Sequence, residues 1–192
     1  GTMAMEAGEQ LKEYGCERPT HIFVQAGVGS LAGAVVGYYS NLYADNPPTF
    51  VVVEAEAAAC LYKGAAAGDG DIRIVDGDME TIMAGLACGE PNTISWDILK
   101  NHVKVFIAAP DWVAANGMRM LGAPIKGDAP VTSGESGAAP FGALAAVMTM
   151  DEYKNLRNDI GLDASSKVLL FSTEGDTDPD RYKNIVWKGL DK

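Results

Sequence analysis

The sequence predicts an α/β protein with an open, mostly parallel sheet covered by helices on both faces. Along the 192-residue chain, short and continuously apolar runs alternate with segments in which apolar residues recur at helical spacing. Strands that are apolar at every position are typical of a parallel sheet buried on both sides. Parallel neighbours need a crossover connection, which is usually a helix. No linker divides these segments, so we expect one domain.

The amino-terminal half supplies two of the expected strands. Glycine and proline punctuate this half, because Gly15 follows an amphipathic segment and Asn46-Pro-Pro interrupts a second one. The expected elements are a helix at 3–15, a strand at 21–25, a helix from the following glycine-rich turn to about residue 43, a strand at 49–54 and a helix at 55–67.

The carboxyl-terminal half continues the alternation after an irregular connection at 69–78, which is rich in Gly and Asp. A second turn of small residues at 132–137 leads into an apolar segment. The expected elements are a helix at 79–88, a strand at 103–107, a helix at 111–121, a helix through residue 148, a helix at 151–160 and a strand at 168–171.

Charge and composition exclude several classes of protein. A formal net charge of −11 disfavours a nucleic-acid partner, whose phosphates attract clustered Lys and Arg. No apolar stretch reaches the roughly 18 residues of a membrane helix, and no signal peptide is expected. Cys16, Cys60 and Cys88 are scattered, which fits reduced thiols in a cytoplasmic protein. With only His21 and His102, neither a metal site nor a hydrolase triad is expected.

The turn at residues 26–33 follows the first strand and opens a helix. Gly27 and Gly29 allow backbone conformations that a Cβ would forbid, so several N–H groups can converge on an anion. Ser30 can add a hydroxyl donor. The same turn is compatible with a plain tight turn, or with a dinucleotide site that uses Ala32 and Glu54 as the relaxed glycine position and the ribose acid.

Two further turns place polar residues where a ligand could lie. Glu135 is flanked by Gly134 and Gly137 at the mouth of a helix, where it could meet a ligand or simply cap the helix. Ser172 follows the last strand and should face the crevice beyond the sheet. The acidic residues after it are equally typical of a solvated loop.

Four segments of the chain, three of them in these turns, carry a family resemblance. Their sequences resemble those of the diaminopropionate ammonia-lyases, which belong to the fold type II, tryptophan-synthase-β-like enzymes that use pyridoxal 5′-phosphate (PLP). The segments, in chain order, are PTHIFVQAGVGSLAGAVVG at 19–37, VEAEAAACL at 53–61, VTSGESGA at 131–138 and FSTEGDTDP at 171–179.

The resemblance implies that residues 1–192 form the carboxyl-terminal, cofactor-binding portion of a fold type II large domain, which is incomplete in this chain. The loop after the first strand would hold the PLP phosphate, the Ser172 hydroxyl would meet the pyridine nitrogen, and Glu135 would line the ring. The implied cofactor-binding residues are Ala26, Gly27, Val28, Gly29, Ser30, Glu135 and Ser172.

The reaction implied by the resemblance is α,β-elimination of 2,3-diaminopropionate, a small amino acid, to pyruvate and two ammonia by a homodimer. It needs a Schiff-base lysine, which the family carries in an upstream motif that this chain lacks. Lys63 and Lys126 have no comparable context and are interpreted as surface residues. We therefore expect no catalytic residue in this chain, and no activity from it alone.

Three other interpretations remain open at this point. The chain could belong to another fold type II lyase, such as a threonine or serine dehydratase or a cysteine-synthase-like protein. It could be an NAD(P)-binding domain that uses Gly27, Gly29 and Ala32 with Glu54. It could also be a non-catalytic binding module.

Overall fold

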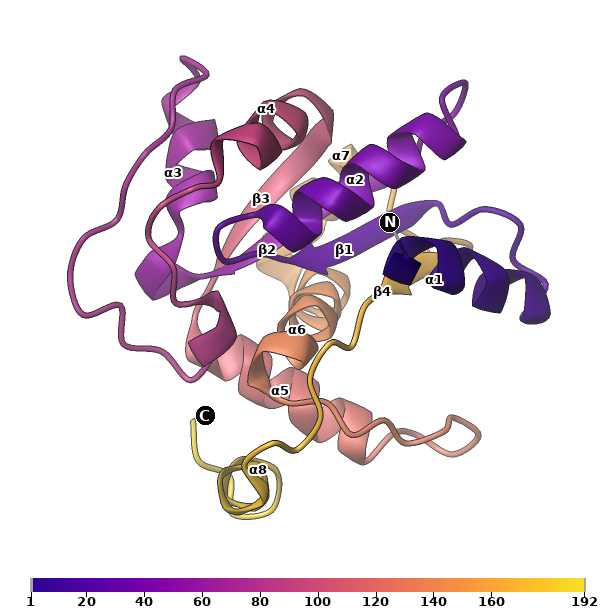
Figure 1. Ribbon diagram of the computed structural model, residues 1–192. Helices are drawn as coiled ribbons and strands as arrows, with labels where there is room; N and C mark the ends of the chain where they lie inside the picture. The colour runs from indigo at the N-terminus through magenta and orange to yellow at the C-terminus, as the bar shows by residue number, and fades with distance from the viewer. Residues whose placement is uncertain (1, 192) are drawn as a thin grey trace.

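The computed structural model describes residues 2–191, and its centre is a four-stranded sheet of order β3-β2-β1-β4 (Figure 1). Every neighbouring pair is parallel, and His21 lies opposite both Thr49 and Val168. The carboxyl ends of the strands therefore meet at one edge. The predicted parallel sheet is confirmed, and its strands are β1 (His21–Gln25), β2 (Thr49–Ala55), β3 (Val103–Ala109) and β4 (Val168–Leu170).

Helices cover both faces of this sheet, as predicted. The helices of one face share an apolar cluster with Ile22 and Val24, and those of the other face share one with Phe23. The first group is α1 (Thr2–Glu13), α2 (Ser30–Leu42), α3 (Cys60–Ala67) and α4 (Thr93–His102). The second group is α5 (Asp111–Gly122), α6 (Glu135–Thr149), α7 (Lys154–Asp159) and α8 (Pro179–Val186).

Strand β1 is apolar at its three central positions. All five of its residues are buried, because successive side chains point to opposite faces and both faces are covered by helices. The polar exceptions at its two ends, His21 and Gln25, are buried as well. No helix within residues 2–191 combines the length and the apolar character that crossing a bilayer requires.

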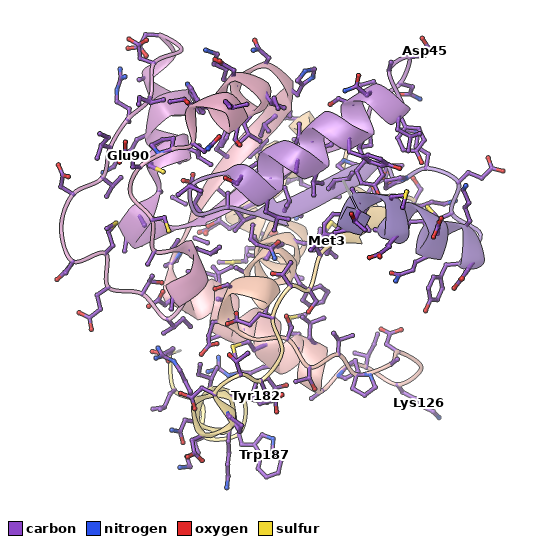
Figure 2. The ribbon with its side chains drawn as sticks, in the orientation of Figure 1. Met3, Asp45, Glu90, Lys126, Tyr182 and Trp187 are labelled. Atoms are coloured by element: carbon purple, nitrogen blue, oxygen red, sulfur yellow. The ribbon has the colours of Figure 1, made fainter. Side chains whose placement is uncertain are left out.

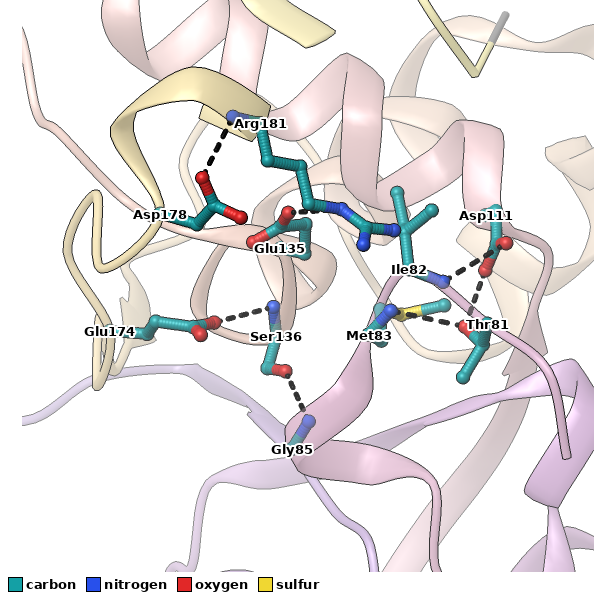
Figure 3. A network of polar contacts seen from close by, with 10 residues as sticks. All are labelled: Thr81, Ile82, Met83, Gly85, Asp111, Glu135, Ser136, Glu174, Asp178 and Arg181. Carbon is teal, nitrogen blue, oxygen red and sulfur yellow. Dashed lines mark hydrogen bonds and ion pairs between the residues drawn. The ribbon is translucent and has the colours of Figure 1, made fainter. Parts of the chain in front are cut away.

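The helix predicted at 79–88 is wrong. This segment is irregular apart from the short 3-10 turn η2 (Ala84–Leu86). The carboxylate of Asp111 accepts hydrogen bonds from the Thr81 hydroxyl and from the Ile82 N–H, the latter at 3.1 Å, which replaces intrahelical bonding (Figure 3). A Cβ on Gly89 would lie 2.0 Å from the Val75 carbonyl oxygen, so backbone packing fixes the end of this segment.

Two helices were not predicted, although each begins with a recognisable cap. Asn92 accepts a hydrogen bond from the Ser95 N–H at 2.9 Å at the start of α4. Asp178 accepts one from the Arg181 N–H at 3.0 Å, and Pro179 follows it at the start of α8. Asn and Asp are preferred N-caps, and Pro suits the first helical position.

The predicted helices at 55–67 and 151–160 each divide into a 3-10 turn and an α-helix. The 3-10 turns are η1 (Glu56–Ala58) and η3 (Asp151–Tyr153), which precede α3 and α7. The Ala-rich helix ends at Gly68 and the later one is followed by Gly161, and both glycines have positive φ. Glycine adopts this conformation without strain, which explains why it ends both helices.

Gly117 sets the distance between α5 and α6. A Cβ at this position would lie 2.4 Å from the Ala138 carbonyl oxygen, whereas a Cβ on Gly37 in α2 would lie 3.7 Å from its nearest neighbour.

We expect Gly117→Ala to lower the free energy of unfolding by about 1–3 kcal/mol. Gly37→Ala should leave it unchanged or raise it by up to about 1 kcal/mol through helix propensity. Urea denaturation of both variants tests this, and equal effects would contradict it.

Candidate cofactor site

A cleft of about 380 Å³ lies at the carboxyl end of β1. Four parts of the chain line it: the loop from β1 into α2, the segment around η2, the start of α6 and the turn after β4. Its polar and small lining residues are Gln25, Ala26, Gly27, Gly29, Ser30, Gly85, Cys88, Ser136, Thr173 and Glu174.

The loop at residues 26–30 presents free backbone donors to this cleft. The Ala26 N–H donates to the Val53 carbonyl at 2.9 Å and so extends the pairing of β1 with β2. Within the described chain, the N–H groups of residues 27–30 donate to no other residue. Four N–H groups at the positive end of α2 form a ready site for an anion. The predicted contribution of Ala26 is therefore limited to its position, since its amide is already bonded.

Gly29 shapes this loop through its backbone. Its φ of 92° is strained for any residue with a side chain. A Cβ there would lie 3.1 Å from the Leu99 Cδ1 and 3.3 Å from the Leu61 Cδ1. The loop therefore packs on apolar side chains of α3 and α4, and only glycine lets the backbone approach them this closely.

The second and third turns pack directly on each other. The Gly134 N–H donates to the Glu174 carbonyl, and the Ser136 N–H donates to the Glu174 carboxylate, both at 2.9 Å. The Gly85 N–H donates to the Ser136 hydroxyl oxygen at 3.2 Å (Figure 3). A Cβ on Gly134 would lie 2.6 Å from the Gly175 carbonyl oxygen. This close packing brings Ser136 and Glu174 to the cleft wall.

Glu135 does not line this cleft. Its carboxylate lies 3.0 Å from the Arg181 Nε, so it ties the start of α6 to α8 (Figure 3). Burial raises the pKa of Glu135, while the Arg181 charge acts in the opposite direction. The predicted contact of Glu135 with the cofactor ring therefore stays a prediction.

Ser172 lies beside the cleft, one residue before Thr173, which lines it. The Ser172 hydroxyl donates to the hydroxyl oxygen of the buried Ser133 at 3.0 Å. Ser172 itself is exposed, as a residue that meets a ligand must be before the ligand binds. Its role at the pyridine nitrogen stays a prediction.

The Glu54 carboxylate is buried and fully hydrogen-bonded within the protein. Glu54 is 1% exposed, and its two carboxylate oxygens accept hydrogen bonds from the N–H groups of Leu61 at 2.8 Å and Tyr62 at 2.7 Å. Burial raises the pKa of Glu54 to about 7, against the effect of these hydrogen bonds. Because both oxygens are bonded to the first turn of α3, Glu54 is not available to a ribose. The NAD(P)-binding interpretation is therefore wrong.

Several lining residues were missed because their partners are distant in sequence. Gln25 and Thr173 are joined by a hydrogen bond of 2.8 Å, although they lie 148 residues apart. Cys88 is close to the loop, since a Cβ on Gly27 would lie 3.4 Å from the Cys88 Sγ.

Lys63 and Lys126 are exposed as expected, and Figure 2 shows Lys126 on the loop between α5 and α6.

The family comparison agrees with this site. Residues 1–164 match the family described as pyridoxal-phosphate dependent enzyme, and the chain belongs to that family. Its cofactor is therefore pyridoxal phosphate, as predicted. The observation that fits this group is the set of four free N–H groups in front of a cleft, which suits a phosphate dianion.

The named relatives of this chain share one enzyme name. The chain is 53% identical over 189 residues to diaminopropionate ammonia-lyase of Salmonella typhimurium strain LT2, which covers 98% of this chain and 47% of the relative. The Escherichia coli K12 enzyme of that name is 47% identical, with 98% and 46% covered. The chain thus spans about half the length of the curated relatives it matches.

A solved structure extends the likeness to the fold. It is the Escherichia coli diaminopropionate ammonia-lyase in complex with an aminoacrylate–PLP azomethine reaction intermediate. The two chains superimpose with a TM-score of 0.90 and 45% sequence identity, over 99% of this chain and 47% of the other. The predicted resemblance to the diaminopropionate ammonia-lyases and the predicted fold type II architecture are confirmed.

Gly29→Ala tests the conformation of the loop. The substitution opposes a φ of 92° and pushes a Cβ against Leu99, so the N–H groups should turn away from the cleft. We expect affinity for 4′-deoxypyridoxine 5′-phosphate, which lacks the aldehyde and cannot react with lysines, to fall at least tenfold by calorimetry. Gly15→Ala carries a similar strain, with φ of 69° and nothing within 4 Å of the Cβ, and should retain affinity. Loss in both variants would contradict a local effect.

Glu54 predicts a pH dependence of stability. Because its pKa is raised in the folded state, the folded protein holds this proton more tightly than the unfolded chain. The free energy of unfolding should therefore fall as the pH rises from about 4.5 to about 7, by up to about 3 kcal/mol. Denaturant unfolding at pH 5 and 7.5 should show a weaker fall in Glu54→Gln than in the wild type. Glu56→Gln, at an exposed position, should keep the wild-type slope.

Proposed function

We propose that residues 1–192 are the carboxyl-terminal, cofactor-binding part of a diaminopropionate ammonia-lyase. The intact enzyme would convert 2,3-diaminopropionate to pyruvate and two ammonia by PLP-dependent α,β-elimination. The observation that carries the proposal is the row of free N–H groups at residues 27–30, at the positive end of α2 and in front of the cleft. The resemblance of four turn segments and the named relatives support the same reaction.

The loop would hold the phosphate of the cofactor. The N–H groups of Gly27, Val28, Gly29 and Ser30 would donate to its oxygens, and the Ser30 hydroxyl can add a further donor. The bound cofactor supplies an electron sink for the charge that develops when the substrate α-proton is removed. The loop amides would fix the position of the cofactor, and no existing hydrogen bond among the described residues would have to break.

Ser172 would set the strength of that electron sink. Its hydroxyl is neutral, so a ring nitrogen bonded to it stays largely unprotonated. The ring then accumulates less charge, which favours elimination over transamination. The Ser172 hydroxyl donates to the Ser133 hydroxyl in this structure. A hydroxyl can both donate and accept, so Ser172 could donate to a ring nitrogen while it accepts from Ser133.

The remaining catalytic groups would lie outside this chain. The Schiff-base lysine and the base for the α-proton are proposed to come from an amino-terminal part of the enzyme. Residues 1–192 alone would then bind the cofactor phosphate without turnover. We also propose that the intact enzyme is a cytoplasmic homodimer, and the free thiols of Cys16, Cys60 and Cys88 support a reducing compartment.

The experiment offers 2,3-diaminopropionate, serine and threonine to the full-length protein loaded with PLP. Chromatography measures pyruvate and 2-oxobutyrate, and ammonia is counted separately. We expect two ammonia per pyruvate from the diamine and at least tenfold lower kcat/KM for serine and threonine. The 192-residue chain alone should give no product. Turnover of serine or threonine with none of the diamine would contradict the proposal.

A further inference from the structure

Gln25 occupies the position between the two proposed contacts of the cofactor. It is the last residue of β1 and directly precedes the loop that presents the free N–H groups. Parallel pairing of β1 with β4 ends at Phe23 and Leu170. The continuation of that register places Gln25 level with Ser172, beyond the point where backbone pairing has stopped.

The side chain of Gln25 takes over where the backbone ladder ends. Its Nε2 donates to the Phe171 carbonyl at 2.9 Å and to the Thr173 Oγ1 at 2.8 Å. These two acceptors belong to the residues immediately before and after Ser172. Both amide hydrogens are thus used on one short segment, and they hold the Phe171 backbone and the Thr173 side chain on either side of Ser172.

Burying the Gln25 side chain lowers the stability of the protein, which indicates that the contacts of its amide group serve another purpose. Gln25 is only 2% exposed, and its Oε1 has no hydrogen-bond partner among the described residues. A buried unpaired carbonyl oxygen costs about 1–3 kcal/mol. The neighbouring inner positions of β1, Phe23 and Val24, are apolar and carry no such cost. An apolar residue at position 25 would avoid the penalty but would leave the Ser172 segment untied.

We propose that Gln25 is a positioning residue that holds the Ser172 hydroxyl at a fixed place relative to the phosphate loop. The inference rests on the proposed function, since it takes residues 27–30 and Ser172 as the two ends of the cofactor site. One side chain on β1 thereby links the phosphate end and the pyridine end. The loop follows Gln25 along the chain, and hydrogen bonds join Gln25 to Phe171 and Thr173, the two neighbours of Ser172.

The test compares two ligands on the cofactor-free, full-length protein. Inorganic phosphate probes the loop alone, whereas 4′-deoxypyridoxine 5′-phosphate probes both ends without forming an adduct. The wild type should bind the pyridine ligand much more tightly than phosphate. In Gln25→Met, phosphate affinity should stay within about twofold, while affinity for the pyridine ligand should fall about tenfold.

His21 provides the matched control at the other end of β1. It is also buried, and its Nε2 hydrogen-bonds to the Ile160 carbonyl at 2.8 Å. His21 begins β1, so it lies at the opposite end of the strand from the cleft. His21→Leu should lower thermal stability but keep the ratio of the two affinities. A ratio that falls equally in His21→Leu and Gln25→Met would overturn the inference.

A double-mutant cycle distinguishes positioning from general stabilisation. If Gln25 acts through Ser172, then Gln25→Met should have little further effect on the pyridine ligand once Ser172→Ala is present. Fully additive losses would overturn the inference. Thr173→Val removes one acceptor at an exposed position and gives the same reading if Gln25→Met fails to fold. A wild type that binds phosphate as well as the pyridine ligand would overturn the proposed function and this inference together.

Discussion

Free backbone N–H groups at the end of β1 are the constraint around which the rest of the site is arranged. Four consecutive amides without a protein partner are costly unless water or an anion satisfies them. The fold keeps them free in two ways. Pairing of Ala26 with Val53 ends the strand at a defined residue, and Gly29 lets the loop settle onto Leu61 and Leu99. The anion site that we propose rests on these local requirements.

The other wall of the cleft depends on contacts between distant segments. Ser136 and Glu174 meet because Gly134 allows two turns to approach within backbone contact. Asp111 holds the segment before η2 out of a helical conformation, so that Gly85 can donate to Ser136. Polar groups that would otherwise be unpaired in the interior thus fix the shape of the cleft. Only the phosphate loop is built from neighbouring residues.

The sequence predicted those parts of the structure that local chemistry decides. The strands, the parallel sheet and the glycine-rich turn between β1 and α2 were predicted from apolar runs and from Gly27 and Gly29, while the phosphate contacts of that turn stay a prediction. The helix at 79–88 was wrong, because Asp111, some 30 residues away, supplies the competing hydrogen bonds. Glu54 resembled a ribose acid only because its partners in α3 could not be seen. Asn92 and Asp178 are local signals that mark the starts of α4 and α8 in the sequence itself. The contacts of Gln25 have no such local signal, because they span almost 150 residues.

The most direct test is a phosphate titration of the isotopically labelled protein, followed by amide resonances in NMR. The account predicts that the N–H signals of residues 27–30 move together and saturate, as the phosphate oxygens replace water. The Ala26 signal should move far less, because its hydrogen bond to Val53 is already made. If the signals of residues 27–30 stay unchanged at saturating phosphate, the loop is not an anion site and the account fails.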